Sequence, residues 1–101
     1  MAQDGYERSE ISGRIILRVG GGVWGETTDA QDRYLAARSH AWLERQFPGC
    51  DVTVDRHAVG VDTIYGSWPD GQDASEEIRD AISTEMPTAQ WFEMMPAAEE
   101  A

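Results

Sequence analysis

The sequence predicts an α+β fold, a small two-layer sandwich in β-α-β-β-α order with a short C-terminal helix. Three observations predict it: segments with the alternation of half-buried strands, two segments with helical apolar spacing, and turn residues between them. Such elements pack most simply with helices on one face of a small, mainly antiparallel sheet. A chain of 101 residues provides one hydrophobic core. We therefore expect a single domain over residues 1–101, with a folded core at 12–95 and frayed ends at 1–10 and 96–101.

The first strand is predicted at residues 14–19, where apolar residues alternate along the chain. A right-handed β-α-β crossover makes this strand a parallel neighbour of the second one if the two are adjacent. The sequence leaves the strand order open. The residues expected on the buried face are Ile15, Leu17 and Val19, and those on the other face are Arg14, Ile16 and Arg18.

The first helix has clear start and stop signals. Thr28 and Gln31 have the spacing of a capping box, and "FPG" at 47–49 ends the helix. Its apolar arc indicates an amphipathic helix that covers a sheet. The residues expected on the inner side are Leu35, Ala36, Ser39, Trp42, Leu43 and Phe47, and those expected opposite are Arg33, Arg38, Glu44 and Arg45.

The next region is predicted to be a hairpin, with Val52 and Val54 facing inward, a turn near Val59-Gly60 and a return strand around 62–65. "WPDG" at 68–71 has Pro and Gly where a type I turn favours them.

The second helix is expected to be capped by Asp73 or Ser75 and to end before Pro87. A short final helix is expected at about 88–95. The inner residues of the second helix are predicted to be Ala74, Ile78, Ala81 and Ile82.

The charge is strongly negative and unevenly distributed. The chain has 19 acidic residues against 8 basic ones, all of them arginines, and a net charge of −11. Residues 1–59 contain nine acids and seven arginines, whereas residues 60–101 contain ten acids and only Arg79. Such a field repels phosphates and anionic membranes and attracts basic surfaces. We therefore expect no direct binding of nucleic acid and no membrane association.

The termini and the cysteine content indicate a cytoplasmic protein. The first residues are acidic rather than basic and apolar, and no apolar run approaches the roughly 18 residues of a membrane span. Cys50 is the only cysteine, so the fold does not depend on a disulfide.

The glycine cluster at 20–25 matches the spacing of a dinucleotide-binding turn. Such a turn must open directly into a helix whose N-terminus faces the phosphates, but Glu26, Thr27 and Thr28 intervene here. Asp55 resembles the ribose-binding acid, which keeps the nucleotide interpretation open. The favoured interpretation is a structural turn or bulge that directs Trp24 over the core.

Two further groups of residues could be either a reactive site or part of the structure, and the first of them lies on the second predicted strand. Asp51, Asp55 and His57, with Asp62 across the predicted hairpin, form a candidate metal or acid–base site, but their spacing matches no standard motif. The favoured alternative is a solvated strand face whose acids lie opposite arginines of the first strand.

Cys50 with His40 or His57 is the only thiol–imidazole combination in the chain. The neighbouring Asp51 opposes formation of a thiolate, which favours a structural cysteine. We expect no catalytic residue, no metal and no cofactor.

The acids of the C-terminal half form a candidate partner-binding site. On the second helix, acids recur at spacings of three, four and seven residues, which predicts a common face with little arginine to neutralise it. The alternative is that these acids stabilise a helix N-terminus and keep the surface soluble. The predicted site residues are Trp68, Asp70, Asp73, Glu76, Glu77, Asp80 and Glu85.

Aromatic residues and methionines could provide the apolar contacts of a binding surface. Part of this set must form the core of so small a domain, and any exposed member beside the acids would provide an anchor for a partner. The set is Trp24, Trp68, Trp91, Phe92, Met94 and Met95.

These features favour a small acidic inhibitor without enzymatic activity. Its expected partner is a basic nucleic-acid-binding protein or nuclease complex, as for nuclease inhibitors, immunity proteins and phage anti-CRISPR proteins. If phage-encoded, it would act in the host cytoplasm. One alternative is a structural or assembly subunit, for example a viral one, that forms a homodimer or larger oligomer through its aromatic patch. A third interpretation is that the acidic surface is an adaptation to high salt. Enzymatic activity is the least favoured interpretation.

Overall fold

The computed structural model describes residues 5–19, 27–56 and 63–96. It confirms the predicted α+β class and the order of the elements. After a 3-10 turn at Arg8–Glu10, the strands are β1 (Ser12–Arg18), β2 (Gly49–Asp55) and β3 (Thr63–Ser67), and the helices are α1 (Asp29–Gln46), α2 (Ser75–Thr84) and α3 (Thr88–Met94). The predicted turn at Val59-Gly60 lies outside the described residues.

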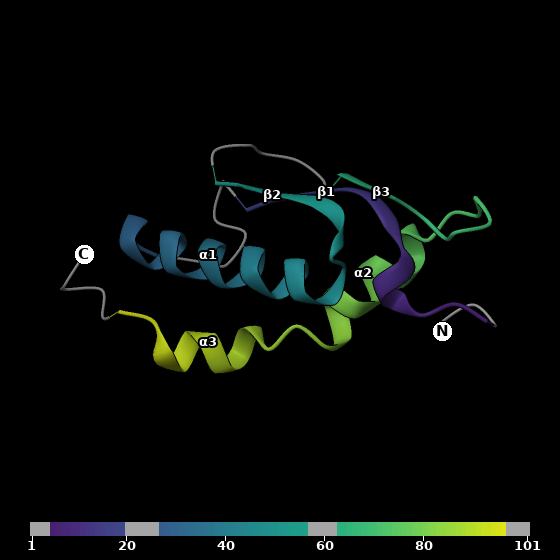
Figure 1. Cartoon of the computed structure of the whole chain (residues 1–101). Coiled ribbons are helices and arrows are strands. Elements are labelled where there is room, and N and C mark those ends of the chain that lie inside the picture. Colours follow the sequence, from purple (N-terminus) through teal and green to yellow (C-terminus); the bar gives the residue numbers. More distant parts are fainter. Residues whose placement is uncertain (1–4, 20–26, 57–62, 97–101) are drawn as a thin grey trace.

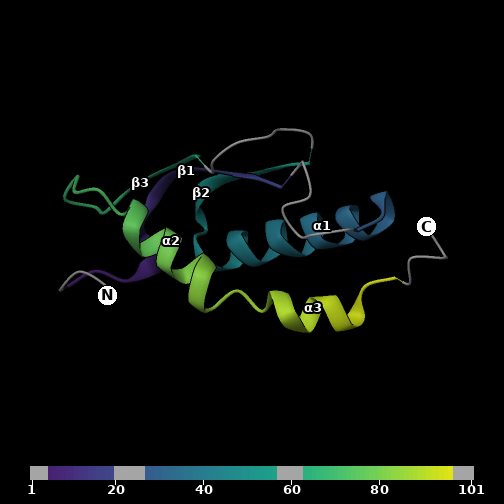
Figure 2. The same cartoon turned by 180° about the vertical axis from the view of Figure 1, so that it is seen from behind.

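The α-helices lie on one side of the sheet (Figures 1 and 2). α1 runs beneath β1 and β2, α2 packs against β3, and α3 runs beside α1. The described part of the chain therefore has a helical layer and a sheet layer.

The sheet has the order β2-β1-β3, which makes β1 the central strand. β1 is parallel to β2 and antiparallel to β3. The parallel neighbourhood of the first two strands is as the crossover rule predicts. The predicted hairpin between β2 and β3 is wrong, and the sheet is mixed rather than mainly antiparallel.

The reason for this order lies in β1. The run Ile15, Ile16 and Leu17 gives β1 apolar residues on both faces, which suits a central strand, whereas β2 alternates with aspartates. The crossover through α1 places β2 on one side of β1, and β3 pairs with the other side of β1 rather than with the outer edge of β2. Gly13 permits that pairing, because a Cβ atom there would lie 1.9 Å from the Tyr65 carbonyl oxygen.

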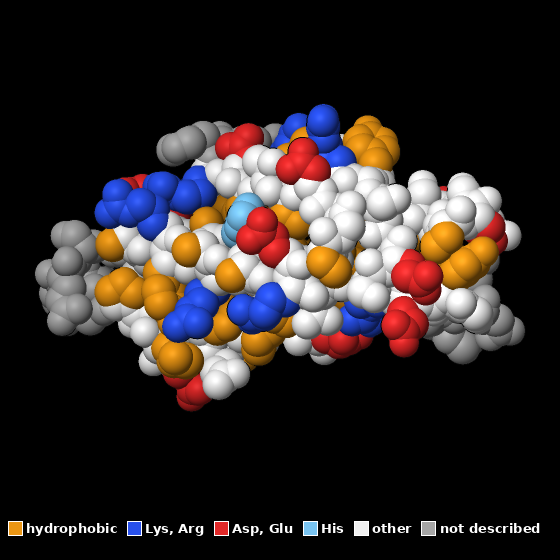
Figure 3. Space-filling view, in the orientation of Figure 1, with side chains coloured by type: hydrophobic (Ala, Val, Ile, Leu, Met, Phe, Trp, Pro, Cys, Tyr) orange, Lys and Arg blue, Asp and Glu red, His pale blue; other side chains and the backbone are white. Residues whose placement is uncertain are grey.

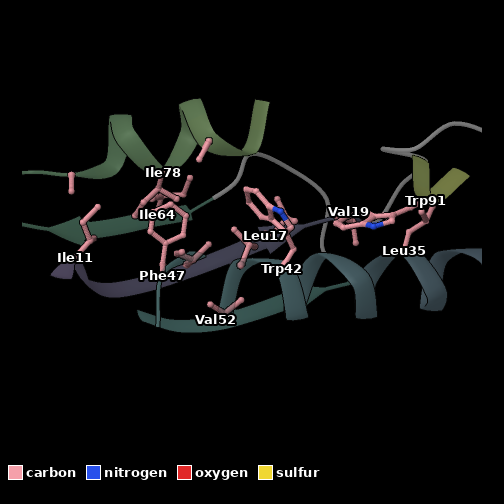
Figure 4. Close-up of a cluster of buried hydrophobic side chains, with 14 of the residues drawn as sticks. Ile11, Leu17, Val19, Leu35, Trp42, Phe47, Val52, Ile64, Ile78 and Trp91 are labelled. Atoms are coloured by element: carbon pink, nitrogen blue, oxygen red, sulfur yellow. The ribbon is translucent and has the colours of Figure 1, made fainter. Parts of the chain in front are cut away.

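The core forms between the helix-facing side of the sheet and α1, α2 and α3 (Figure 4). Ile15, Leu17 and Val19 are buried, as predicted, and so are all six residues predicted for the inner side of α1. Burial of large apolar side chains is the dominant stabilising term in such a domain.

Helix α1 begins as predicted. Thr28 Oγ1 accepts a hydrogen bond from Gln31 N at 3.2 Å, and Gln31 Oε1 accepts one from Thr28 N at 3.0 Å. At the other end, Phe47 N donates to the Leu43 carbonyl oxygen and the Phe47 ring is fully buried. Helix α2 begins differently: Asp73 Oδ1 accepts from Ser75 N at 3.0 Å, while Ala74 occupies the N-cap position.

The segment before β1 packs onto the domain. Ile11 is fully buried, and the ring of Tyr6 stacks on Trp68 with centroids 6.4 Å apart. The packed part of the chain thus starts before residue 12, where the folded core was expected to begin.

Replacing Gly13 by alanine should destabilise the protein by at least about 3 kcal/mol, because φ at Gly13 is +145° and the added Cβ atom meets backbone at 1.9 Å. Urea unfolding followed by circular dichroism measures the loss. Gly66→Ala is the matched control, since its Cβ atom would meet the movable Ile78 Cδ1 at 2.4 Å. Equal losses in the two variants would contradict this account of the sheet.

Candidate functional site

The seven predicted site residues lie on one continuous stretch of structure. Trp68 follows β3, and Gly71 N donates to its carbonyl oxygen at 2.8 Å, which closes the predicted turn at 68–71. The chain then enters α2 and leaves it at Glu85. Figure 3 shows one face of the molecule, on which several arginines lie over α1 and the sheet and acidic side chains are scattered among them and toward the opposite end.

The structure divides these residues into exposed and buried ones. Trp68 is 6% exposed and Glu77 is 8% exposed, so neither lies on the open surface. The other five are exposed, and together they form what we call the α2 acidic surface: Asp70, Asp73, Glu76, Asp80 and Glu85.

Arg8 neutralises part of the acidic cluster. Its Nη1 and Nη2 atoms donate to the two carboxylate oxygens of Glu85 at 2.8 and 2.7 Å. Its Nε and Nη2 atoms donate to Glu77 Oε2 at 3.2 and 2.8 Å. A further bond reaches Gln46 at 3.2 Å, and the guanidinium lies over the Phe47 ring. We call this group the Arg8 clamp.

The Arg8 clamp corrects the expectation that little arginine neutralises the acids of α2. Arg8 is 69 residues from Glu77 in sequence, so helical spacing gave no sign of it. A signal for Glu77 itself was present: it lies three residues after Ala74 and four before Ala81, both buried. That spacing places Glu77 toward the inner side of α2, where a carboxylate needs a partner.

The surroundings of the acids favour their charged forms. The hydrogen bonds from Arg8 hold the pKa of Glu85 below its usual value. The hydrogen bond from Ser75 N does the same for the pKa of Asp73. The carboxylates also raise the pKa of Arg8. These groups therefore stay ionised at neutral pH.

Two hollows lie beside α2. One of about 240 Å³ is lined by Trp68 and Ala74 with four acids, Asp73, Glu76, Glu77 and Asp80. A more open one of about 600 Å³ is lined by the Arg8 clamp residues Arg8, Gln46, Glu77 and Glu85 with Glu7, Ser9 and Asp80. Carboxylates so placed can accept paired hydrogen bonds from guanidinium groups.

The predicted metal or acid–base constellation is only partly described. Asp51 and Asp55 lie on the sheet face away from the helices, in register with Arg14 and Arg18. His57 and Asp62 lie outside the described residues. Among the residues that the structure describes, no three His, Cys, Asp or Glu side chains are placed to hold a metal ion.

Cys50 and His40 make separate contacts. The Cys50 thiol lies 3.7 Å from the Ile11 carbonyl oxygen, and burial raises its pKa. His40 Nε2 lies 3.1 Å from the Val52 carbonyl oxygen, and Nδ1 lies 3.3 Å from Glu44. His40 is thus engaged away from the thiol.

The predicted aromatic patch is largely core. Trp68 and Trp91 are buried, and Phe92 and Met95 pack against the core. Met94 is 55% exposed. Trp24 and the glycine cluster at 20–25 lie outside the described residues.

Comparisons with protein-family models, with curated proteins and with solved structures found no match for this chain. Within residues 5–19, 27–56 and 63–96, no helix has the length and apolar character that crossing a membrane requires.

Arg8→Ala should cost about 2–3 kcal/mol of unfolding free energy, because it leaves the buried Glu77 carboxylate without its guanidinium. The measurement is the urea midpoint at pH 7. Arg45→Ala, at an exposed position, is the control and should cost less than about 0.5 kcal/mol. In the Arg8→Ala background, Glu77→Gln should recover part of the loss. An Arg8→Ala protein as stable as the control would refute the clamp.

Stability should fall on acidification below about pH 4. The lowered pKa values of Asp73 and Glu85 mean that their contribution is complete above the pKa of the unfolded chain and is lost as pH falls through the lower folded-state pKa. Urea midpoints measured between pH 7 and pH 2 test this. Arg8→Ala should flatten the dependence, since it removes the cause of the Glu85 shift; an unchanged curve would contradict that cause.

Proposed function

We propose that this protein is an acidic, non-enzymatic binding protein that inhibits a basic nucleic-acid-processing protein by occupying its nucleic-acid-binding surface. The α2 acidic surface carries the proposal. Its five carboxylates are exposed on α2, on the turn before it and, for Glu85, at its C-cap, where Arg8 contacts it, and the only base in residues 60–101 is Arg79. A surface built for phosphates offers the arginine and lysine side chains that such a group attracts.

The spacing of the carboxylates supports this proposal. Asp73, Glu76 and Asp80 follow one another at intervals of three and four residues. Asp73 lies just before α2, and on the helix a rise of about 1.5 Å per residue separates Glu76 and Asp80 by about 6 Å along the axis. The phosphates of one DNA strand rise by about 3.4 Å each, so the two charge densities are of the same order.

The Arg8 clamp, which fixes the position of α2, also favours binding. The Arg8 clamp joins α2 to the segment before β1 and, through Gln46, to the end of α1. A surface held in place before binding loses little conformational entropy when a partner docks. The uneven charge distribution further accelerates association with a basic partner.

This proposal places the protein in the cytoplasm with its partner, the host cytoplasm if the chain is phage-encoded. Phage anti-defence proteins and nuclease inhibitors are the classes whose task requires such a surface. An assembly subunit that associates through the aromatic patch has less support, because Trp68 and Trp91 belong to the core.

Glu76→Lys with Asp80→Lys should weaken partner binding roughly tenfold or more, since both carboxylates are exposed and outside the Arg8 clamp. Glu77 is left intact because its reversal would disturb the fold. Tagged wild-type and variant proteins are used to capture proteins from a bacterial lysate that contains a nucleic-acid-targeting defence complex. Salt steps elute the bound proteins for mass spectrometry.

The matched control is Glu44→Lys with Glu93→Lys, which changes the net charge equally on α1 and α3. We expect the wild type and the control to retain a basic protein that added DNA or RNA displaces, and the α2 variant to lose it. Equal capture by all three proteins, or a captured partner that nucleic acid does not displace, would refute the proposal.

A further inference from the structure

The sheet face that points away from the helices is not covered by any described element (Figures 1 and 2). Its residues alternate with the buried Ile15, Val52 and Ile64, which point to the helices. Tyr65, 67% exposed, is the most exposed large hydrophobic residue of the described chain. We call this the outer sheet face, and its strand residues lie in four cross-strand rows: Gly49, Ser12 and Ser67; Asp51, Arg14 and Tyr65; Thr53, Ile16 and Thr63; Asp55 and Arg18.

The charges of the outer sheet face are balanced. β1 contributes two arginines and β2 two aspartates, in a chain whose net charge is −11. Arg14 and Asp51 are both exposed and in register, yet no ion pair joins them. Arg14 and Asp51 therefore form the exposed charged row of this face, and Ile16 and two threonines separate it from the half-buried Arg18 and Asp55, which make other interactions.

The edges of the sheet are less open than this face. On the β2 side, His40 lies 3.1 Å from the Val52 carbonyl oxygen. On the β3 side, Ser75 Oγ donates to the Ile64 carbonyl oxygen at 3.0 Å and Ala74 N to that of Gly66 at 2.7 Å. Carbonyl groups engaged in this way do not accept an added strand. A partner for the sheet is therefore expected on its face.

We propose that two copies of this chain associate back to back through the outer sheet face, about a two-fold axis that runs parallel to the strands between β1 and β2. The rotation places Arg14 over Asp51 of the partner subunit, and by symmetry Asp51 over Arg14 of the partner subunit. The product has four layers, in the order helix, sheet, sheet, helix. Such an interface is isologous, the commonest kind among soluble oligomers.

A second copy fits this face better than a partner of one charge sign. The outer sheet face has no net charge to attract a strongly basic or acidic surface, whereas the exposed Arg14 beside the exposed Asp51 is complementary to a second copy turned about this axis. α2 packs on the opposite side of the sheet, where a Cβ atom on Gly66 would meet Ile78. The two α2 acidic surfaces therefore lie on the outer layers of the dimer, and salt at physiological strength screens charges beyond about 8 Å.

The overlap is small, because two strands of seven residues from each copy supply most of it. Stable interfaces bury more than about 1,000 Å² in total, so this dimer is reversible and depends on concentration. It leaves both α2 acidic surfaces free, and a dimer presents two of them to a partner with repeated basic sites.

Exchange of charges between copies tests this proposal by sedimentation velocity over a concentration series. The wild type should shift from monomer toward dimer as concentration rises. Arg14→Asp and Asp51→Arg should each remain monomeric, because like charges then face each other across the axis. An equimolar mixture of the two variants should recover the dimer, since each charge again faces its opposite. Arg45→Asp and Glu93→Arg, on the helical layer, are the controls and should dimerise like the wild type.

A wild type that stays monomeric up to its solubility limit would overturn the proposal, and so would single variants that dimerise like the controls or a mixture that does not associate. Circular dichroism first confirms that each variant is folded. Amide chemical shifts of the wild type on dilution provide a test without substitutions. Changes centred on β1 and β2 support the interface, and changes centred on α3 or α2 overturn it.

Discussion

The ion pairs of Arg8 are the interaction on which the arrangement of this domain most depends. One guanidinium contacts the carboxylates of Glu77 and Glu85 and the amide of Gln46, and it lies over the Phe47 ring. It thereby joins the segment before β1, the end of α1 and the whole length of α2. A buried carboxylate such as Glu77 is tolerated only with such a partner, because desolvation of an unpaired charge is costly.

The same clamp decides which acids face the solvent. It removes Glu77 from the surface and engages Glu85 from one side, while Asp70, Asp73, Glu76 and Asp80 remain open to solvent. Arg8, a partly exposed arginine of the segment before β1, thus helps to hold the acidic helix α2 against the rest of this negatively charged protein. This arrangement gives the α2 acidic surface a fixed geometry, which a disordered acidic tail of the same charge would lack.

The two layers separate two kinds of surface. The helical layer carries the carboxylates of α2, and the opposite face of the sheet carries balanced charges around Ile16 and Tyr65. Helix α2 and the proposed dimer contact lie on opposite sides of the sheet, so a partner on Glu76 and Asp80 and a second copy at Arg14 and Asp51 occupy different faces. The two surfaces meet at the β3 edge, where Asp73 and Tyr65 line the same hollow.

The sequence by itself determined the elements whose causes are local. The hydrogen bonds between Thr28 and Gln31, the alternation along β1 and the apolar arc of α1 involve residues at most a few positions apart, and the structure confirms them. The acidic character of α2 is likewise local. The tertiary structure decided what depends on distant residues. It paired β3 with β1, where Gly13 permits the close approach of Tyr65, and it brought Arg8 to Glu77 across 69 residues of sequence. Alternation shows which face of a strand is buried, but not which strand lies beside it. Spacing likewise places an acid on a helix face without identifying the distant cation that neutralises it.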